Sequence, residues 1–193
     1  MSKLHIIFFI LISLCIHAND SAAQKLKSKQ GEAVYEREVQ AFIRYIHKER
    51  LKDSTYVLIN EPEIRAGSEK LVESNPTFSV EEKNNFYKTL KNQRIKSWKG
   101  IWPFKIKFIS SYELKSYKSI NSFDWTAFKK DVSTSYYVIS SPVFLRNFRF
   151  CVYYEANYSD SSEIGFAKLY KKVGSNWVLE KSVCLWYNSW TIN

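Results

Sequence analysis

The fold is decided by one stretch near the end of the chain, residues 148–186, which reads FRFCVYYEANYSDSSEIGFAKLYKKVGSNWVLEKSVCLW. Within it, residues 148–158, 164–173 and 177–186 are three runs rich in aromatic and β-branched side chains, the composition of β-strands. Short polar connections separate the runs, one rich in serine and one containing Gly174. Because connections this short join antiparallel neighbours, the stretch predicts a three-stranded antiparallel meander.

Helices are predicted in three places before the meander. Residues 32–52 place apolar side chains at three- and four-residue spacing, with glutamates at the start and basic residues at the end, an order that suits the helix dipole. Residues 79–97 begin with SVEE, the pattern of a capping box, and predict a second helix. A shorter helix is expected over residues 122–132.

Further strands are predicted between these helices. Residues 56–60 and 136–140 are short β-like runs that end at prolines. Residues 104–117 alternate between apolar and charged side chains, which indicates a half-buried antiparallel strand or the arm of a hairpin. Residues 61–78, which contain glycine and proline, are expected to be irregular.

Helices early in the chain and strands late in it indicate an α+β fold. We expect N-terminal helices packed on a mostly antiparallel sheet that ends in the meander. By analogy of element order, an NTF2-like or a cystatin-like wrap fits this description. The expected organisation is a single domain over residues 32–193, preceded by a flexible, lysine-rich lead-in over residues 24–31.

Residues 1–23 have the features of a secretory signal peptide. Lys3 precedes an apolar run over residues 6–16, and small residues lead to Ala23, so cleavage is expected between Ala23 and Gln24. The sequence therefore predicts export to the periplasm or the medium. Two alternatives stay open: a lipoprotein modified at Cys15, and an uncleaved membrane anchor.

Composition excludes several classes of protein. Five glycines and four prolines in 193 residues are too few for a low-complexity chain, and a hydrophobic content of 45% is that of a globular protein. The net charge of +10 survives cleavage, because residues 1–23 hold one lysine and one aspartate. Beyond residue 23 the only histidine is His47, which we interpret as a helix-surface side chain. The mature chain has two cysteines in addition to this histidine, and these three side chains are too few for a structural zinc site, which takes four Cys or His ligands. The sequence therefore predicts neither a metal site nor a cofactor.

The two cysteines of the mature chain raise two opposing expectations. Export favours a disulfide between Cys151 and Cys184. The predicted meander opposes it, because Cys184 would lie two strands across and about 17 Å further along the sheet. A disulfide requires Cα atoms within about 7 Å of each other, so both outcomes stay open.

A series of residues over the region 122–190 has a characteristic order and spacing. The residues are Asp124-Trp125 with Phe128, Ile139-Ser140-Ser141-Pro142-Val143-Phe144, Tyr153-Tyr154, Gly165, Leu169-Tyr170-Lys171-Lys172, Gly174 with Trp177, and Trp186. In these residues the chain resembles an uncharacterised family of small exported bacterial proteins. The resemblance implies no activity, cofactor or catalytic residue. The chain departs from the family at residues 159–165, where members often carry a loop rich in glycine and cysteine, and structural roles explain every matched residue.

Basic and aromatic side chains interleave over residues 94–118. Basic groups attract anions, and aromatic faces stack on sugars or bases. The structural alternative is a helix end followed by a strand with lysines on its solvent side. If the stretch binds a ligand, the candidate residues are Trp98, Trp102, Lys105, Lys107 and Lys115.

Three functions are consistent with the sequence. The first is a non-enzymatic binding protein whose partner is an anionic envelope glycan or a lipid headgroup, since export disfavours nucleic acid. The second is a hydrolase that uses carboxylates such as Glu61 or Glu63 in an aromatic cleft, which would require a further acid in the same pocket. The third is an inhibitor or immunity-type protein that binds a protein target. The scarcity of catalytic motifs weighs against an enzyme.

Overall fold

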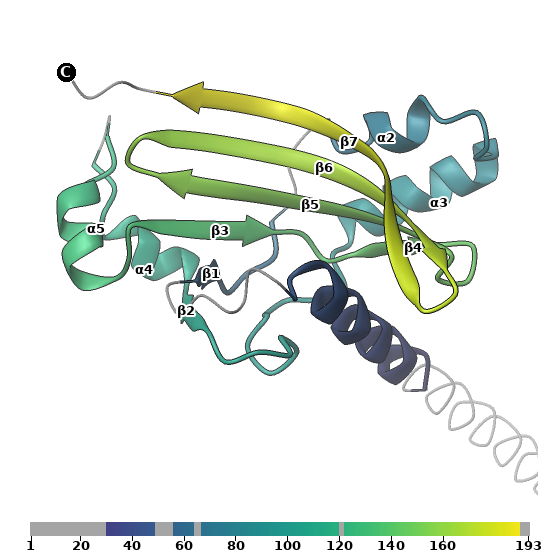
Figure 1. Ribbon diagram of the computed structural model, residues 1–193, viewed down its shortest axis with the longest axis horizontal. Coiled ribbons are helices and arrows are strands. Elements are labelled where there is room, and N and C mark those ends of the chain that lie inside the picture. The colour runs from purple at the N-terminus through teal and green to yellow at the C-terminus, as the bar shows by residue number, and fades with distance from the viewer. Residues whose placement is uncertain (1–29, 49–55, 64–66, 120–121, 190–193) are drawn as a thin grey trace, which may run out of the picture. The chain divides into compact units, whose positions relative to one another are not determined.

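A computed structural model describes residues 30–48, 56–63, 67–119 and 122–189 (Figure 1). The predicted signal peptide and residues 24–29 of the predicted lead-in lie outside these ranges. Contacts divide the chain into two compact units, residues 1–39 and residues 40–193. Residues 30–46 are helical, so the helix begins two residues earlier than expected and gives way to a turn at residues 47–48.

The α+β fold is confirmed in the larger unit, whose central element is a mostly antiparallel seven-stranded sheet. The strand order is β2-β1-β3-β5-β6-β7, and β4 pairs with β5 beside this path. The strands are β1 (Val57–Ile59), β2 (Lys107–Ile109), β3 (Ser135–Ile139), β4 (Val143–Leu145), β5 (Phe150–Ser159), β6 (Ser162–Val173) and β7 (Asn176–Ser189).

The three-stranded meander consists of β5, β6 and β7, as predicted. The strand β6 pairs antiparallel with both β5 and β7. Its ladder with β5 contains nine residue pairs, from Phe150↔Lys171 to Tyr158↔Glu163. Gly174 adopts φ +61° between β6 and β7, a conformation that glycine accepts without steric cost. The β6–β7 ladder contains two register shifts, which give β7 a stronger local twist.

The start of the sheet differs from the simple antiparallel pattern. The strand β1 pairs in parallel with both β2 and β3. Parallel neighbours need long crossover connections, and these carry the helices α2 (Lys70–Glu73), α3 (Val80–Lys91), α4 (Ser111–Lys115) and α5 (Trp125–Asp131). The parallel pairing therefore brings residues far apart in sequence to the same end of the sheet.

The predicted helix over residues 79–97 begins as expected but ends earlier. The Ser79 side chain accepts a hydrogen bond from the Glu82 amide, and the Glu82 carboxylate accepts one from the Ser79 amide. The helix stops at Lys91 because the following residues bond elsewhere: the Ile95 amide donates to Ser141 Oγ at 3.2 Å, and the Trp98 amide to the Asn60 carbonyl at 2.8 Å. Residues 61–78, expected to be irregular, contain α2.

The predicted strand over residues 104–117 is wrong beyond its centre. Only Lys107–Ile109 pair in the sheet, as β2, and the chain turns into α4 two residues later. Ser110 caps α4: its hydroxyl accepts from the Glu113 amide at 3.1 Å, while the Glu113 carboxylate accepts from the Ser110 amide at 2.7 Å. The capping box outweighs the apolar alternation that favoured a strand.

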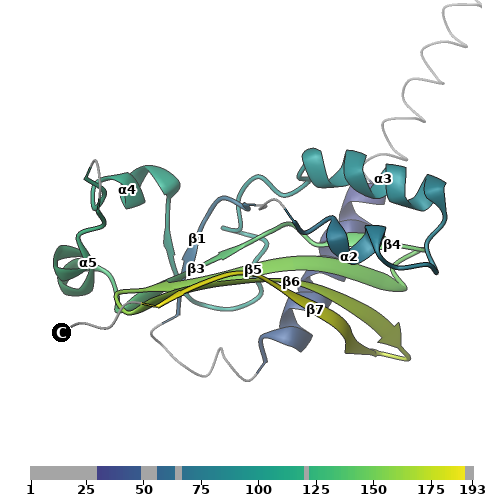
Figure 2. The same ribbon diagram turned by 90° about the horizontal axis from the view of Figure 1, so that it is seen from above.

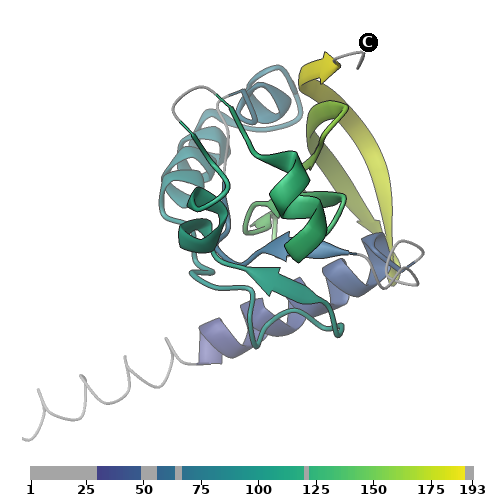
Figure 3. The same cartoon turned by 90° about the vertical axis from the view of Figure 1, so that its left-hand side faces the viewer.

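The two faces of the sheet are both buried along β5, where alternate side chains belong to separate cores. One face, here called the cluster face, carries Tyr154 and Tyr158 and is covered by the helices α2, α3, α4 and α5. Figure 2 shows α2 and α3 near one end of this face and α4 and α5 near the other. Figure 3 views the molecule from the α4–α5 end, with α5 in green towards the viewer.

The opposite face of the sheet is packed with aromatic rings. Phe42 makes edge-to-face contacts with Tyr153 at 5.4 Å and with Trp177 at 5.1 Å between ring centroids. His47 lies on this face as well and is only 1% exposed. It was predicted to be a surface histidine, and that prediction is wrong because aromatic rings surround it, Trp102 at 5.3 Å among them.

Candidate functional site

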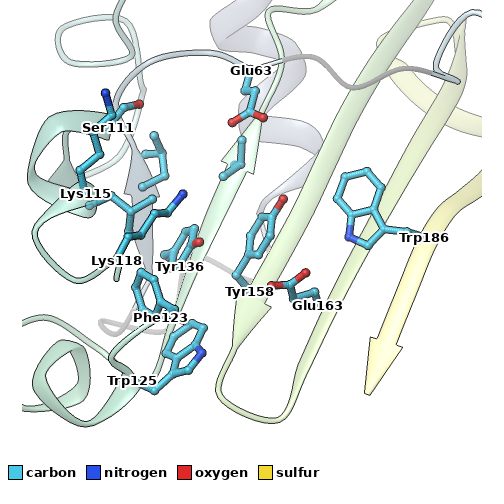
Figure 4. Close-up of a pocket in the computed structure, with 13 residues that line it drawn as sticks. Glu63, Ser111, Lys115, Lys118, Phe123, Trp125, Tyr136, Tyr158, Glu163 and Trp186 are labelled. Carbon is cyan, nitrogen blue, oxygen red and sulfur yellow. The ribbon is translucent and has the colours of Figure 1, made fainter. Parts of the chain in front are cut away.

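A pocket of about 600 Å³ opens at the α4–α5 end of the cluster face (Figure 4). Its walls come from segments that are distant in sequence: the end of β1, α4 and the turn after it, the start of α5, and the strands β3, β5, β6 and β7. The lining residues are Ile59, Glu63, Ser111, Leu114, Lys115, Lys118, Phe123, Trp125, Tyr136, Val138, Tyr158, Glu163 and Trp186.

One wall of the pocket is aromatic. Tyr136 on β3 and Tyr158 on β5 are a cross-strand pair whose rings stack at 4.9 Å with an interplanar angle of 8°. Trp125 continues the stack over Tyr136 at 5.9 Å and 22°. Offset stacking of this kind holds each ring in one orientation, so the wall is built before a ligand arrives.

The start of α5 places two members of this wall. Asp124 caps the helix, because its carboxylate accepts a hydrogen bond from the Ala127 amide at 2.9 Å. Phe123, one residue before the cap, packs against Phe128 at 5.3 Å in the arrangement of a hydrophobic staple. The cap and the staple together orient Phe123 and Trp125, whose rings lie 4.5 Å apart.

The opposite wall depends on a glycine. Gly165 on β6 pairs with Trp186 on β7, and a Cβ atom added to Gly165 would lie 2.6 Å from the Trp186 ring. The indole therefore lies directly over the glycine backbone, 5.7 Å from the Tyr154 ring. A larger residue at position 165 would displace Trp186 from the pocket.

Four charged side chains complete the lining. Lys115 ends α4, and Lys118 lies in the following turn, where its backbone bridges to Phe123. Glu163 stands opposite Tyr158 in the β5–β6 ladder. Glu63 follows β1, and its backbone amide donates to the Ile139 carbonyl at 3.0 Å. Figure 4 shows the lysines on the α4 side and Glu163 with Trp186 on the β6–β7 side.

The two carboxylates on either side of Pro62 have different roles. Glu61 accepts hydrogen bonds from the Ser111 amide at 2.8 Å and the Ser111 hydroxyl at 2.9 Å. Burial raises the pKa of Glu61, but the bonds from Ser111 outweigh it and lower the pKa overall. Glu61 therefore fixes the start of α4 as a carboxylate, while Glu63 faces the pocket.

The five ligand-binding residues predicted from sequence do not form one site. Lys115 lines the pocket. Trp98 and Trp102 are buried, with their rings in edge-to-face contact at 5.5 Å. Lys107 donates to the carbonyls of Asp131 and Val132 at the end of α5, and Lys105 is exposed. The basic and aromatic residues of this stretch thus separate into surface and core.

Cys151 and Cys184 are both free thiols. Cys151 on β5 pairs with Tyr170, whereas Cys184 on β7 pairs with Phe166, so the two lie on strands separated by β6. Cys151 is buried, and burial raises the pKa of its thiol well above the usual value. Cys184 is exposed.

A second pocket, of about 430 Å³, lies on the opposite face of the sheet. Its charged groups are paired with each other, since Lys168 Nζ lies 2.9 Å from the Glu155 carboxylate. His47 Nε2 and the Tyr153 hydroxyl form another buried hydrogen bond on this face, at 2.9 Å. Because the charged groups of the second pocket pair with each other, the larger pocket is the candidate site.

Two further observations concern the described ranges alone. Within them, no group of three histidine, cysteine, aspartate or glutamate side chains is arranged to hold a metal ion. In the same ranges, no helix combines the length and the apolar composition needed to cross a membrane.

Comparison of the chain with models of protein families, with curated proteins and with solved structures gives no match. The resemblance to exported bacterial proteins and the two suggested architectures therefore stay predictions. Sequence reasoning missed most of the pocket, including Phe123, Tyr136 and Tyr158. The sequence did contain a pattern that could have pointed to the pocket. Trp125, Gly165 and Trp186 belong to the residues that carry the resemblance, and the structure brings all three to the pocket region.

Proposed function

We propose that the protein is a binding protein that accepts a small polar group of an envelope molecule, a sugar ring of a glycan or the headgroup of a lipid, in the pocket between α4, α5 and β7. The observation that supports this is the lining itself. Five aromatic side chains and four charged ones surround one cavity of about 600 Å³. Ligand sites commonly combine apolar walls with a few polar groups that orient the ligand.

The chemistry of the lining suits a ligand that is flat on one side and polar at its edge. The half-buried rings of Trp125 and Trp186, with the accessible edges of the stacked Tyr136 and Tyr158, offer an apolar surface for a ring or an alkylammonium group. Carboxylates and ammonium groups at the rim can exchange hydrogen bonds with hydroxyls, amines or phosphates. The predicted export would bring the pocket to the compartment where glycans and lipid headgroups are exposed.

The pocket modifies the hypothesis of a simple anion binder. Two lysines and two glutamates line it, so the net charge of +10 is not concentrated there. The general positive charge would instead favour approach to an anionic envelope, with a strength that falls as salt rises. Recognition would then depend on the aromatic wall and the local charges.

The test is a fluorescence titration of the wild-type protein with soluble glycan fragments and free headgroups. We expect saturable quenching by at least one probe, and a loss of affinity of about tenfold or more in Trp125→Ala and Trp186→Ala. The matched control is Tyr112→Ala, because Tyr112 is an aromatic residue of α4 that is 84% exposed and outside the pocket. Equal losses in all three variants would contradict the assignment of the pocket.

A second candidate function, a carboxylate-based hydrolase, is supported by one observation. Glu63 and Glu163 line the same pocket, beside an aromatic wall. Two carboxylates across a sugar-sized cavity can act as acid and base in glycoside hydrolysis. Release of a phenol from aryl glycosides that disappears in both Glu63→Gln and Glu163→Gln would favour hydrolysis, whereas binding without turnover would favour the first function.

A further inference from the structure

We infer that the pocket selects a zwitterionic group, in which a positively charged nitrogen lies a few atoms from a phosphate or a carboxylate. The inference rests on the proposed binding function and specifies the class of ligand. It comes from the arrangement of charges in the pocket, where Lys115 and Lys118 lie on the α4 side and Glu163 lies on the β6 side, apart from Glu63.

The side that receives the cation contains Glu163. This side chain is half-buried on β6, and none of the residues that the structure describes forms an ion pair or a side-chain hydrogen bond with its carboxylate. Withdrawing a carboxylate from water without a counter-charge is unfavourable. Tyr158 and Trp186 line the cavity beside it, and aromatic faces attract cations. A ligand ammonium placed here would satisfy the carboxylate and contact both rings.

The side that receives the anion contains Lys115 and Lys118. They lie three residues apart at the end of α4 and its following turn, and neither pairs with an acidic residue within the described ranges. Two acidic side chains of this wall are engaged with α4 itself, since Glu61 is bonded to Ser111 and Glu113 to Ser110. The two ammonium groups are thus left for a group in the pocket.

Because both positive and negative side chains line the pocket, a ligand that carries charge of only one sign fits it less well than a zwitterion does. A ligand with only negative charge would meet the carboxylates of Glu63 and Glu163, and a ligand with only positive charge would meet Lys115 and Lys118. Like charges in a shared cavity repel. A zwitterion oriented with its nitrogen towards β6 and its anionic group towards α4 complements both walls.

The experiment compares matched probes by fluorescence titration and calorimetry. Phosphocholine and glycine betaine carry both charges, choline carries only the cation, glycerol 3-phosphate only the anion, and glucose neither. We expect at least one zwitterion to bind about tenfold or more tightly than choline and glycerol 3-phosphate. Vesicles of phosphatidylcholine, compared with free phosphocholine, distinguish a membrane source from a soluble one.

Two charge variants assign the ends of the ligand. Glu163→Gln should reduce zwitterion affinity to that of the anion-only probe, and the double variant Lys115→Met, Lys118→Met should reduce it to that of choline. The controls are Glu81→Gln and Lys130→Met, since both are exposed residues of helices outside the pocket. Circular dichroism of each variant verifies that the fold is retained.

Each outcome bears on a different claim. Tighter binding of a zwitterion, lost in the charge variants and kept in the controls, supports the inference. Equal binding of choline, glycerol 3-phosphate and the zwitterions overturns it, as does binding of glucose that the charge variants leave unchanged, and in both cases the binding function stands. The absence of binding by every headgroup and glycan probe overturns the binding function as well.

Discussion

The two ends of the cluster face are built from the same kinds of element and differ in what fills them. At the α2–α3 end, short helices lie on the sheet and the space is closed: Leu71, Val72 and Phe86 are fully buried in one cluster. At the α4–α5 end, the helices α4 and α5 leave a cavity of about 600 Å³. The α2–α3 end is therefore a packed core, whereas the α4–α5 end encloses a cavity.

At the α2–α3 end, here called the closed end, the Arg146 guanidinium binds to α3 through Glu82. Arg146 Nε donates to Glu82 Oε1 at 2.6 Å and Nη2 donates to Glu82 Oε2 at 3.0 Å, while the guanidinium lies 5.1 Å from the Phe78 ring centroid. Arg146 also donates to the Thr77 carbonyl. It stands at the start of three consecutive left-handed residues, with φ 50°, 51° and 64°. Backbone strain of this kind persists only where surrounding contacts hold it, and the Arg146 bonds supply them.

At the α4–α5 end, here called the open end, several charged side chains line the cavity. Glu163, Lys115 and Lys118 line the cavity without pairing to one another or to other residues in the described ranges. At the closed end Arg146 and Glu82 pair between α3 and the turn after β4. At the open end Lys129 of α5 also pairs, with Asp160 after β5, but the charged groups named above face the cavity. The two ends therefore differ in where their charged groups lie: around a closed cluster at one end, and around a cavity at the other.

The largest effect is expected from Phe86→Ala at the closed end. The side chain is fully buried in the α2–α3 cluster, so its removal should cost about 3–5 kcal/mol in the free energy of unfolding. Urea denaturation measures this loss. Ligand affinity in the remaining folded protein should not change. A loss below about 1 kcal/mol would show that the closed end is not tightly packed.

Gly165→Ala tests the open end. The new Cβ would meet the Trp186 ring, so we expect a loss of stability of about 1–3 kcal/mol together with weaker ligand binding. The control is the same change in a Trp186→Ala background, where the clash is absent and the cost in unfolding free energy should largely disappear. An equal cost in both backgrounds would place the strain elsewhere.

The Arg146–Glu82 pair predicts an acid sensitivity of the closed end. Hydrogen bonds from Arg146 and the Ser79 amide lower the pKa of Glu82 from 4.5 to about 2. A lowered carboxyl pKa adds stability above pH 4.5, and this is lost as the pH falls through about 2. The urea midpoint of wild type should exceed that of Arg146→Gln at pH 6, and the gap should shrink towards pH 2. A constant gap would contradict the pairing.

The smallest effect is expected from Lys107→Met at the open end. Its ammonium group donates to the last carbonyls of α5, a favourable position relative to the helix dipole that is worth about 0.3–1 kcal/mol. Thermal unfolding should show this small loss. Lys105→Met is the matched control, because Lys105 is an exposed lysine two residues away. Equal effects of the two changes would show that the contact contributes nothing.

The sequence predicts the parts of the fold that depend on neighbouring residues. The meander follows from strand composition and short turns, and the start of α3 from its capping box. The strand expected over residues 104–117 is wrong because a second capping box, at Ser110 and Glu113, lies within an apolar alternation. His47 is misplaced because burial depends on distant aromatic partners such as Tyr153.

The pocket could not be derived in this way, since its residues meet only through long-range pairing. The parallel pairing of β1 with β2 and β3 brings Glu63 and α4 to one end of the sheet, and the β6–β7 hairpin carries Trp186 to it. Strands of three residues, such as β1, give too weak a pattern to specify such a partner. The hypothesis of a carboxylate in an aromatic cleft named Glu63, while its companion Glu163 lies 100 positions further along the chain.

The most direct test follows the indole N–H signals of the tryptophans by nuclear magnetic resonance during a titration with phosphocholine and glycine betaine. Trp125 and Trp186 line the open end, whereas Trp98 and Trp177 are buried elsewhere. The binding account predicts saturable shifts of the Trp125 and Trp186 signals, with Trp98 and Trp177 unchanged, and the zwitterion inference predicts that Glu163→Gln needs a higher ligand concentration for the same shifts. Saturable binding that moves only Trp98 or Trp177 would contradict the binding account, and shifts that keep the wild-type affinity in Glu163→Gln would contradict the zwitterion inference.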